Sequence, residues 1–177
     1  MTLISSRRTA AARLHGHGDL DRARQLYRKV LDLDPRDADA LYSMGVLAEE
    51  SDALKDAVCL MSQSLDLEPT AEKCIFIGKV LEKQNRNAAA LAYYRKAKQL
   101  DPCGPTTLEA LAEALDRRQE YEESSGVWAR RLRLECCDSA RQLQLRLYLT
   151  NALRLAGHLS PAGQVLRQAR AMSSGSS

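Results

Sequence analysis

The chain has 177 residues, of which 45% are hydrophobic and 28% charged, and its net charge is only +3. This charge does not by itself indicate a nucleic acid partner, and no apolar run reaches the roughly 18 residues of a membrane-spanning helix. Five cysteines without a CxxC motif predict a reduced, cytoplasmic chain with no disulfide framework. Aromatic residues make up 5% of the chain, while alanine and leucine are abundant, which favours helices over sheets.

The first two segments of the chain read as helices. Residues 4–16 are expected to form a helix that ends at the glycines of His15-Gly16-His17-Gly18. We interpret these two histidines as part of a turn, because a structural zinc site needs four ligands. A second helix is expected from Asp19 to Leu33, and it stops before Pro35 because the residue preceding a proline is disfavoured in the α region.

Residues 40–69 have the clearest pattern in the chain. Apolar and small residues three and four apart, including Met44, Gly45 and Ala48, indicate the buried face of one helix. Ala57 and Met61 lie on a second helix. A glycine inside a helix costs about 1 kcal/mol relative to alanine. We therefore interpret Gly45 as the place where the second helix approaches closely, and Ala57 as small for the same reason.

The same pattern returns along the chain at a nearly fixed period. Pro35 and Pro69 are 34 residues apart, and Pro69 and Pro102 are 33 apart. The last interval is longer, because Trp128 and its counterpart Leu166 are 38 residues apart. We expect these four additional residues to lengthen a helix that begins near Ser139.

A period of 33 to 34 residues with this spacing resembles the tetratricopeptide repeat (TPR), a helix–turn–helix unit. The resemblance covers nearly the whole chain. It implies an all-α, right-handed superhelical solenoid of about five units in a single domain, 4–172, followed by a disordered tail, 173–177. The expected repeats are 4–37, 38–70, 71–104, 105–138 and 143–172.

The resemblance also implies a binding surface, because the first helices of the repeats in this family line a concave groove that holds a peptide or a partner's helix. Tyr42, Val46 and Phe76, with Ile75, are the candidate apolar anchor site, although Ile75 and Phe76 have an alternative place in the core. Asp116 and the predicted acidic groove residues would favour basic groups on the ligand. The predicted groove residues are Arg8, Tyr42, Ser43, Val46, Glu49, Phe76, Lys79, Glu109 and Glu113.

No catalytic motif is present, so the sequence predicts a protein that is not an enzyme, with no catalytic residue, metal or cofactor. The adjacent Cys136 and Cys137 could bind a soft metal, but we interpret them as packed small residues. The expected function is that of a non-catalytic scaffold or adaptor in the cytoplasm, with a protein or peptide partner. One alternative is a regulatory module of a larger enzyme of the glycosyltransferase or sulfotransferase type.

Two further alternatives concern the C-terminal region. Residues 130–177 hold eight arginines and two acids, so this end is a rival site for nucleic acid or an anionic surface. Only Tyr148 is available there for base stacking, which argues against nucleic acid. No solvating helix follows residue 172, and Ala162, Val165, Leu166 and Ala169 are expected to face water. That expectation has three interpretations: self-association through the last helix, a piece of a longer protein, or an apolar patch small enough to be tolerated, and we favour the first two over the third. The arginines are Arg130, Arg131, Arg133, Arg141, Arg146, Arg154, Arg167 and Arg170.

Overall fold

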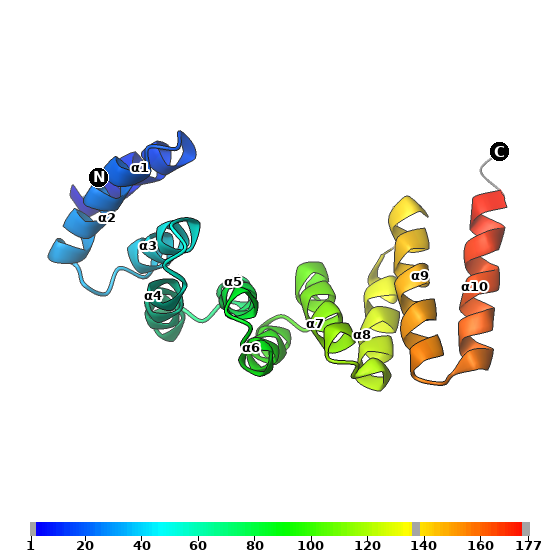
Figure 1. The fold of residues 1–177 in the computed structure, drawn as a ribbon. Coiled ribbons are helices and arrows are strands. Elements are labelled where there is room, and N and C mark those ends of the chain that lie inside the picture. The colour runs from blue at the N-terminus through cyan, green and yellow to red at the C-terminus, as the bar shows by residue number, and fades with distance from the viewer. Residues whose placement is uncertain (1–2, 136–138, 175–177) are drawn as a thin grey trace. The chain divides into compact units, whose positions relative to one another are not determined.

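The computed structural model describes residues 3–135 and 139–174, and these residues form ten helices and no strand (Figure 1). The all-α prediction is therefore confirmed for the described residues. The helices are α1 (Leu3–Gly16), α2 (Leu20–Leu33), α3 (Ala38–Glu50), α4 (Leu54–Leu67), α5 (Ala71–Lys83), α6 (Asn87–Leu100), α7 (Pro105–Arg117), α8 (Tyr121–Leu134), α9 (Ser139–Leu155) and α10 (Leu159–Ser174). None of these described helices is long and apolar enough to cross a membrane.

The helices follow one another as pairs joined by short turns of one common type. In each turn one residue has a positive φ: Gly18, Asp52, Asn85, Gln119 or Gly157. The backbone amide of the residue after it donates a hydrogen bond to the carbonyl five residues earlier, as from Asp19 to Leu14 (3.0 Å) and from Glu120 to Leu115 (3.0 Å). This is the Schellman arrangement, which satisfies the last carbonyl groups of a helix and reverses the chain. The repeated turn brings the second helix of each pair back against the first.

Gly45 and Ala57 lie where α3 packs against α4, as the sequence predicts. Gly45 is buried, and Ala57 is 0% exposed. A Cβ atom at Gly45 would lie 2.5 Å from Cγ of Met61 and 3.3 Å from the backbone oxygen of Ala57. The close packing of these two helices therefore depends on the absence of a side chain at position 45.

The contacts of the chain divide it into two compact units, Met1–Tyr93 and Tyr94–Ser177, with the boundary inside α6. Each unit is described by itself. The core of unit 1 consists of the facing sides of its helices, with Tyr27, Leu47, Met61 and Ile77 almost completely buried. The core of unit 2 is similar and is built around Trp128, with Tyr94, Leu108, Leu111 and Leu115 also buried. The single domain 4–172 remains a prediction.

Of the two C-terminal helices, α9 begins where the sequence predicts, whereas α10 ends later than predicted. Helix α9 begins at Ser139 and has 17 residues, four more than α7 with 13, which accounts for the longer last interval. The helix thus begins at Ser139 and is lengthened as predicted, while the start of the fifth repeat at 143 remains a prediction. Helix α10 continues to Ser174, so the predicted tail at 173 begins too early. Extending an existing helix costs little compared with starting one. Residues 175–177, and Cys136 and Cys137, lie outside the described residues.

The last helix also corrects an expectation about its exposed face. Ala162 and Ala169 are 5% and 2% exposed, because these small residues lie against α9 rather than facing water. Val165 and Leu166 are half-buried. The apolar surface predicted for self-association is therefore smaller than the sequence indicates.

Candidate functional site

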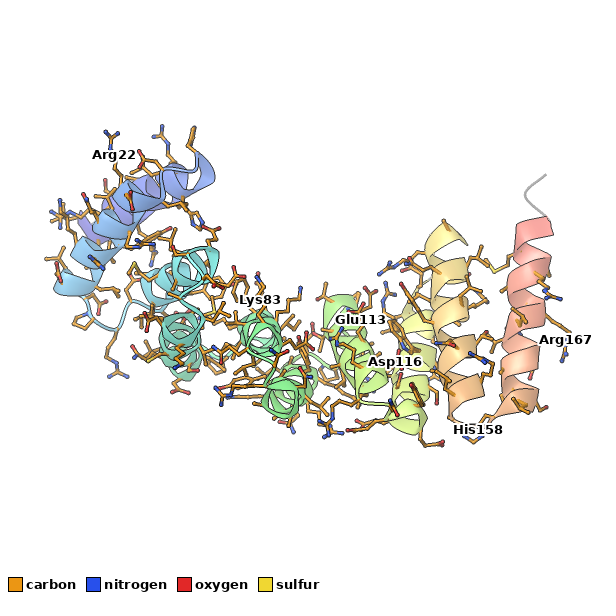
Figure 2. The ribbon with its side chains drawn as sticks, viewed as in Figure 1. Arg22, Lys83, Glu113, Asp116, His158 and Arg167 are labelled. Atoms are coloured by element: carbon orange, nitrogen blue, oxygen red, sulfur yellow. The ribbon has the colours of Figure 1, made fainter. Side chains whose placement is uncertain are left out.

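Helices α3 and α5 of unit 1 lie side by side and carry most of the predicted groove residues. The rings of Tyr42 and Phe76 pack edge to face with their centroids 5.9 Å apart. About two turns further along both helices, Lys83 pairs with Glu49. Figure 2 labels Lys83 on α5. We call the surface formed by Tyr42, Val46, Glu49, Phe76, Lys79 and Lys83 the α3–α5 face.

The α3–α5 face is presented to solvent because both helices bury their other sides. Leu41, Gly45 and Leu47 of α3 are buried, as are Cys74, Ile77, Gly78 and Leu81 of α5. Tyr42, Val46 and Phe76 are left half-buried, and Lys79 is exposed. Phe76 and Ile75 are thus neither fully core residues nor fully exposed ones. Apolar side chains that remain partly exposed can still bury more surface on binding a ligand.

Tyr42 has an environment that favours its neutral form. Burial of the phenol raises the pKa of Tyr42 above its ordinary value, and the negative charge of Glu72 on α5 raises it further. Desolvation and a nearby like charge both disfavour the phenolate. Tyr42 therefore keeps its hydroxyl proton at neutral pH and presents a hydrogen-bond donor at the edge of the aromatic pair.

Two charged residues of the predicted groove are already paired within unit 1. Arg8 donates from Nη1 to both carboxylate oxygens of Asp37 (3.1 and 3.2 Å) and lies 2.9 Å from Asp39. Asp37 also caps α3 by accepting from the amide of Ala40 at 2.8 Å. Glu49 has its partner in Lys83. Lys79 has no hydrogen-bond or ion-pair partner among the residues that the structure describes. Ser43 is half-buried beside Tyr42.

The remaining predicted groove residues, Glu109 and Glu113, belong to unit 2. Glu109 accepts from Nε of Arg131 at 2.7 Å and also pairs with Arg141. Asp116 accepts from the indole nitrogen of Trp128 at 2.9 Å and from the hydroxyl of Ser124. Glu113 is exposed and has no partner in the described part of the chain (Figure 2). Of the four acids predicted to attract a basic ligand, Glu49 and Glu109 are thus neutralised by ion pairs, whereas Asp116 is hydrogen-bonded to neutral groups and Glu113 is exposed.

Several arginines of the C-terminal region also have partners inside unit 2. Arg131 is 5% exposed and binds Glu135 at 3.0 Å as well as Glu109. The hydrogen bond from Arg141 to Glu109 raises the pKa of Arg141, which keeps it charged. Arg146 donates to Gln142. The sequence contained one signal of this cluster, because Arg131 stands at a place where the repeat pattern expects a small residue.

The titratable residues elsewhere do not gather into a second site. His15 lies 3.1 Å from Glu50, whereas His17 contacts the carbonyl of Arg13 at 2.6 Å, so the two histidines have different partners. His158 pairs with Glu122 at 2.8 Å. Among residues 3–135 and 139–174, no group of three or more His, Cys, Asp or Glu side chains could hold a metal ion.

Known proteins share this arrangement of helices. A TPR repeat family model matches residues 13–50, and a tetratricopeptide repeat model matches residues 71–102. The chain is a tetratricopeptide repeat protein. This fold is typical of protein-interaction scaffolds and of non-catalytic modules.

Similar solved structures cover nearly all of this TPR chain. MamA has a TM-score of 0.79 at 17% identity, covering 97% of this chain and 92% of MamA. YrrB, described as a TPR protein with an unusual peptide-binding site, has a TM-score of 0.75 at 19% identity, with 94% and 84% covered. At these identities the likeness shows the fold alone.

A curated relative is similar in sequence over a shorter part of its own length. Cellulose synthase 2 operon protein C of Komagataeibacter xylinus is 29% identical over 130 residues, which is 72% of this chain. The chain spans about a tenth of the length of that relative, since the match covers 10% of it.

Proposed function

We propose that this TPR chain is a non-catalytic scaffold that captures a peptide or a helix of a partner protein on its α3–α5 face. The observation that carries this proposal is the Tyr42–Phe76 pair, whose two half-buried rings pack at 5.9 Å on adjacent first helices. Ring pairs of this kind occupy the centres of many protein interfaces, because large, rigid side chains bury much surface and lose little freedom.

The apolar part of this face explains how a ligand would gain affinity. Tyr42, Phe76 and Val46 of the next turn form a continuous half-buried surface. Burying apolar surface contributes about 25 cal/mol for each Å² removed from water. The backbone that carries these rings is helical and packed on the unit 1 core, so little ordering is needed on binding.

The charges of the face have a smaller part in this proposal. Glu49 and Arg8 have partners within unit 1, so neither is a free charge for a ligand, and the preference for a basic ligand stays a prediction that rests on the acids of unit 2. Lys79 and Glu72 are the exposed charges of opposite sign that remain near the rings. We therefore propose recognition through an apolar or aromatic anchor residue that lies over the ring pair, with the hydroxyl of Tyr42 as a donor to the peptide backbone.

A pull-down from a nuclease-treated lysate tests the proposal. The wild type is compared with a Tyr42→Ala/Phe76→Ala variant whose helicity is checked by circular dichroism. The matched control is Tyr148→Ala, which removes a ring from the stacked Trp128–Tyr148 pair in unit 2. A protein retained by the wild type and by the control, but lost by the double variant, supports the α3–α5 face. Equal retention by all three proteins overturns it.

We propose as a second candidate that the chain is a regulatory repeat module of a larger protein. The observation in its favour is the similarity to a tenth of a long relative whose name connects it with a cellulose synthase operon. Glycosyl-transferring machinery is then the class of partner. The genomic reading frame provides the test, because a catalytic domain encoded in frame with this chain supports the candidate, and a stop codon directly after Ser177 contradicts it.

A further inference from the structure

A second surface of unit 1 lies on the opposite side of α3. Here α2, α3 and α4 enclose an open cavity of about 480 Å³. Arg24 and Arg28 of α2 form one wall, Asp56 lies on α4, and Met44, Ala48 and Leu60 supply apolar surface. We call this cavity the outer groove.

The geometry of α3 separates the outer groove from the α3–α5 face. Each residue of a helix is rotated by about 100° from the one before it. Relative to Tyr42, Val46 is therefore at about 40°, whereas Met44 and Ala48 are at about 200° and 240°. A ligand in the outer groove and a ligand on the α3–α5 face would thus contact different sides of the same helix.

The next repeat explains why the groove is open. At the corresponding places of α4, α5 and α6, the residues are Ser62 for Arg28, Leu81 for Ala48, and Tyr93 for Leu60. Leu81 is buried, and the hydroxyls of Tyr93 and Ser62 lie 3.5 Å apart. Larger side chains thus occupy the place that Ala48 and Leu60 leave open. The sequence of the second repeat keeps this groove accessible.

The two arginines of the groove differ in their partners. Nη2 of Arg24 donates to the hydroxyl of Ser51 at 2.7 Å, and its Nη1 lies 3.8 Å from Asp21. Arg28 is exposed and has no hydrogen-bond or ion-pair partner among residues 3–135 and 139–174. A guanidinium group next to apolar surface fits a carboxylate that adjoins an apolar side chain, since its N–H groups match the two carboxylate oxygens.

We propose that the outer groove binds an acidic segment of a partner protein. An apolar side chain of that segment lies on Met44, Ala48 and Leu60, and the carboxylate of a neighbouring Asp or Glu pairs with Arg28. Arg24, held by Ser51, adds positive charge to the same wall. Asp56 on α4 repels acids from the other wall, which fixes the side on which the carboxylate lies. This site goes beyond the proposed function, because it uses another face and another recognition chemistry.

A library of random peptides displayed on phage tests the outer groove. The library is selected on the wild type, on Arg28→Ser and on Ala48→Leu. Both substitutions place the residue of the next repeat at the same position, so the fold is expected to tolerate them. Peptides with an apolar residue next to Asp or Glu are expected from the wild type, with about ten-fold weaker binding to each variant, since a charge-assisted pair is lost or the apolar surface is filled.

The control variant is Tyr42→Ala/Phe76→Ala, which should bind the acidic peptides as the wild type does. Loss of these peptides in the control would assign them to the α3–α5 face and overturn the outer groove. Recovery of the same peptides with Arg28→Ser would also overturn it, as would a selection that yields no acidic apolar peptide. Arg28 is a surface residue, so its variant stays informative even if Ala48→Leu impairs folding.

Discussion

One buried position of the second helix holds a different kind of residue in the fourth helix pair than in the first three pairs. The eleventh residue is Val30 in α2, Ser64 in α4 and Ala97 in α6, each 0% exposed, but it is Arg131 in α8, at 5%. A small or apolar residue needs at most one polar partner there, as where Ser64 donates to the carbonyl of Ala38 at 2.6 Å. A buried guanidinium needs several.

The partners of Arg131 show how the fourth pair meets this requirement. Glu109 on α7 and Glu135 at the end of α8 both bind Arg131, and Arg141 on α9 binds Glu109 as well. A buried ion pair gains little over an apolar contact, because desolvation offsets the attraction, but removing one partner leaves a buried charge. The comparison shows that the same fold accepts either a small residue or a buried arginine with its ion pairs at this position. The stability of the ion-paired arrangement is the more sensitive to substitution.

The largest loss of stability is expected where the ion pairs of Arg131 are broken. Glu109→Ala removes the carboxylate that binds both Arg131 and Arg141, and should lower the free energy of unfolding by about 3 kcal/mol. Urea unfolding followed by circular dichroism measures it. Glu113→Ala on the same helix is the control, because Glu113 is exposed, and should change stability by less than about 0.5 kcal/mol. Equal effects of the two substitutions would show that Glu109 is merely a surface residue.

A smaller loss of stability is expected where the close packing of α3 against α4 is disturbed. Gly45→Ala adds a Cβ atom that would lie 2.5 Å from Cγ of Met61 and 3.3 Å from the backbone oxygen of Ala57, so the Met61 side chain must shift or α3 and α4 must move apart. Overpacking should cost about 1–3 kcal/mol, less the roughly 1 kcal/mol that alanine gains over glycine in a helix.

Gly126 of α8 provides the matched control for Gly45. It lies inside a helix, and nothing lies within 4 Å of a Cβ atom built there. Gly126→Ala should therefore raise the free energy of unfolding by about 0.5–1 kcal/mol. If Gly45→Ala also stabilised the protein, the close approach of α3 and α4 would not depend on the glycine.

The turns within the helix pairs contain positions where a substitution should increase the stability of the protein. Gln119 has a φ of 62°, although the equivalent positions in the first and last pairs are Gly18 and Gly157. The left-handed region costs a residue with a Cβ atom about 1 kcal/mol relative to glycine. Gln119→Gly should therefore stabilise the protein by about that amount in thermal unfolding. Asn85→Gly should gain less, because asparagine tolerates this region better. A larger gain for Asn85→Gly would contradict this explanation.

The local features of this fold were predictable from single residues and their spacing. Gly45 and Ala57 stand out in a helical pattern, and the interval from Trp128 to Leu166 indicates a longer helix. The cluster around Arg131 was not predictable in the same way, because it depends on which side chains of α7, α8 and α9 meet. Likewise, the outer groove results from the sizes of side chains on three helices, and no motif identifies such a space.

The smallest expected effect concerns Tyr42, whose equivalent in α7 is Glu109, the fifth residue of its helix. Burial, with the charge of Glu72, raises the pKa of Tyr42 above the ordinary value of 10.0. The folded state thus favours the protonated phenol, so its contribution to stability is complete below the unfolded pKa and is lost as pH rises through the folded pKa. The difference in phenolate absorbance between the wild type and Tyr42→Phe should place this transition above pH 10.0, and Glu72→Gln should move it down only in part, because burial is the larger cause. A peptide on the α3–α5 face should move it further up, since the ligand excludes more water from the phenol. An unchanged transition with such a peptide bound would place the ligand away from the α3–α5 face, and the outer groove would then be the first surface to examine.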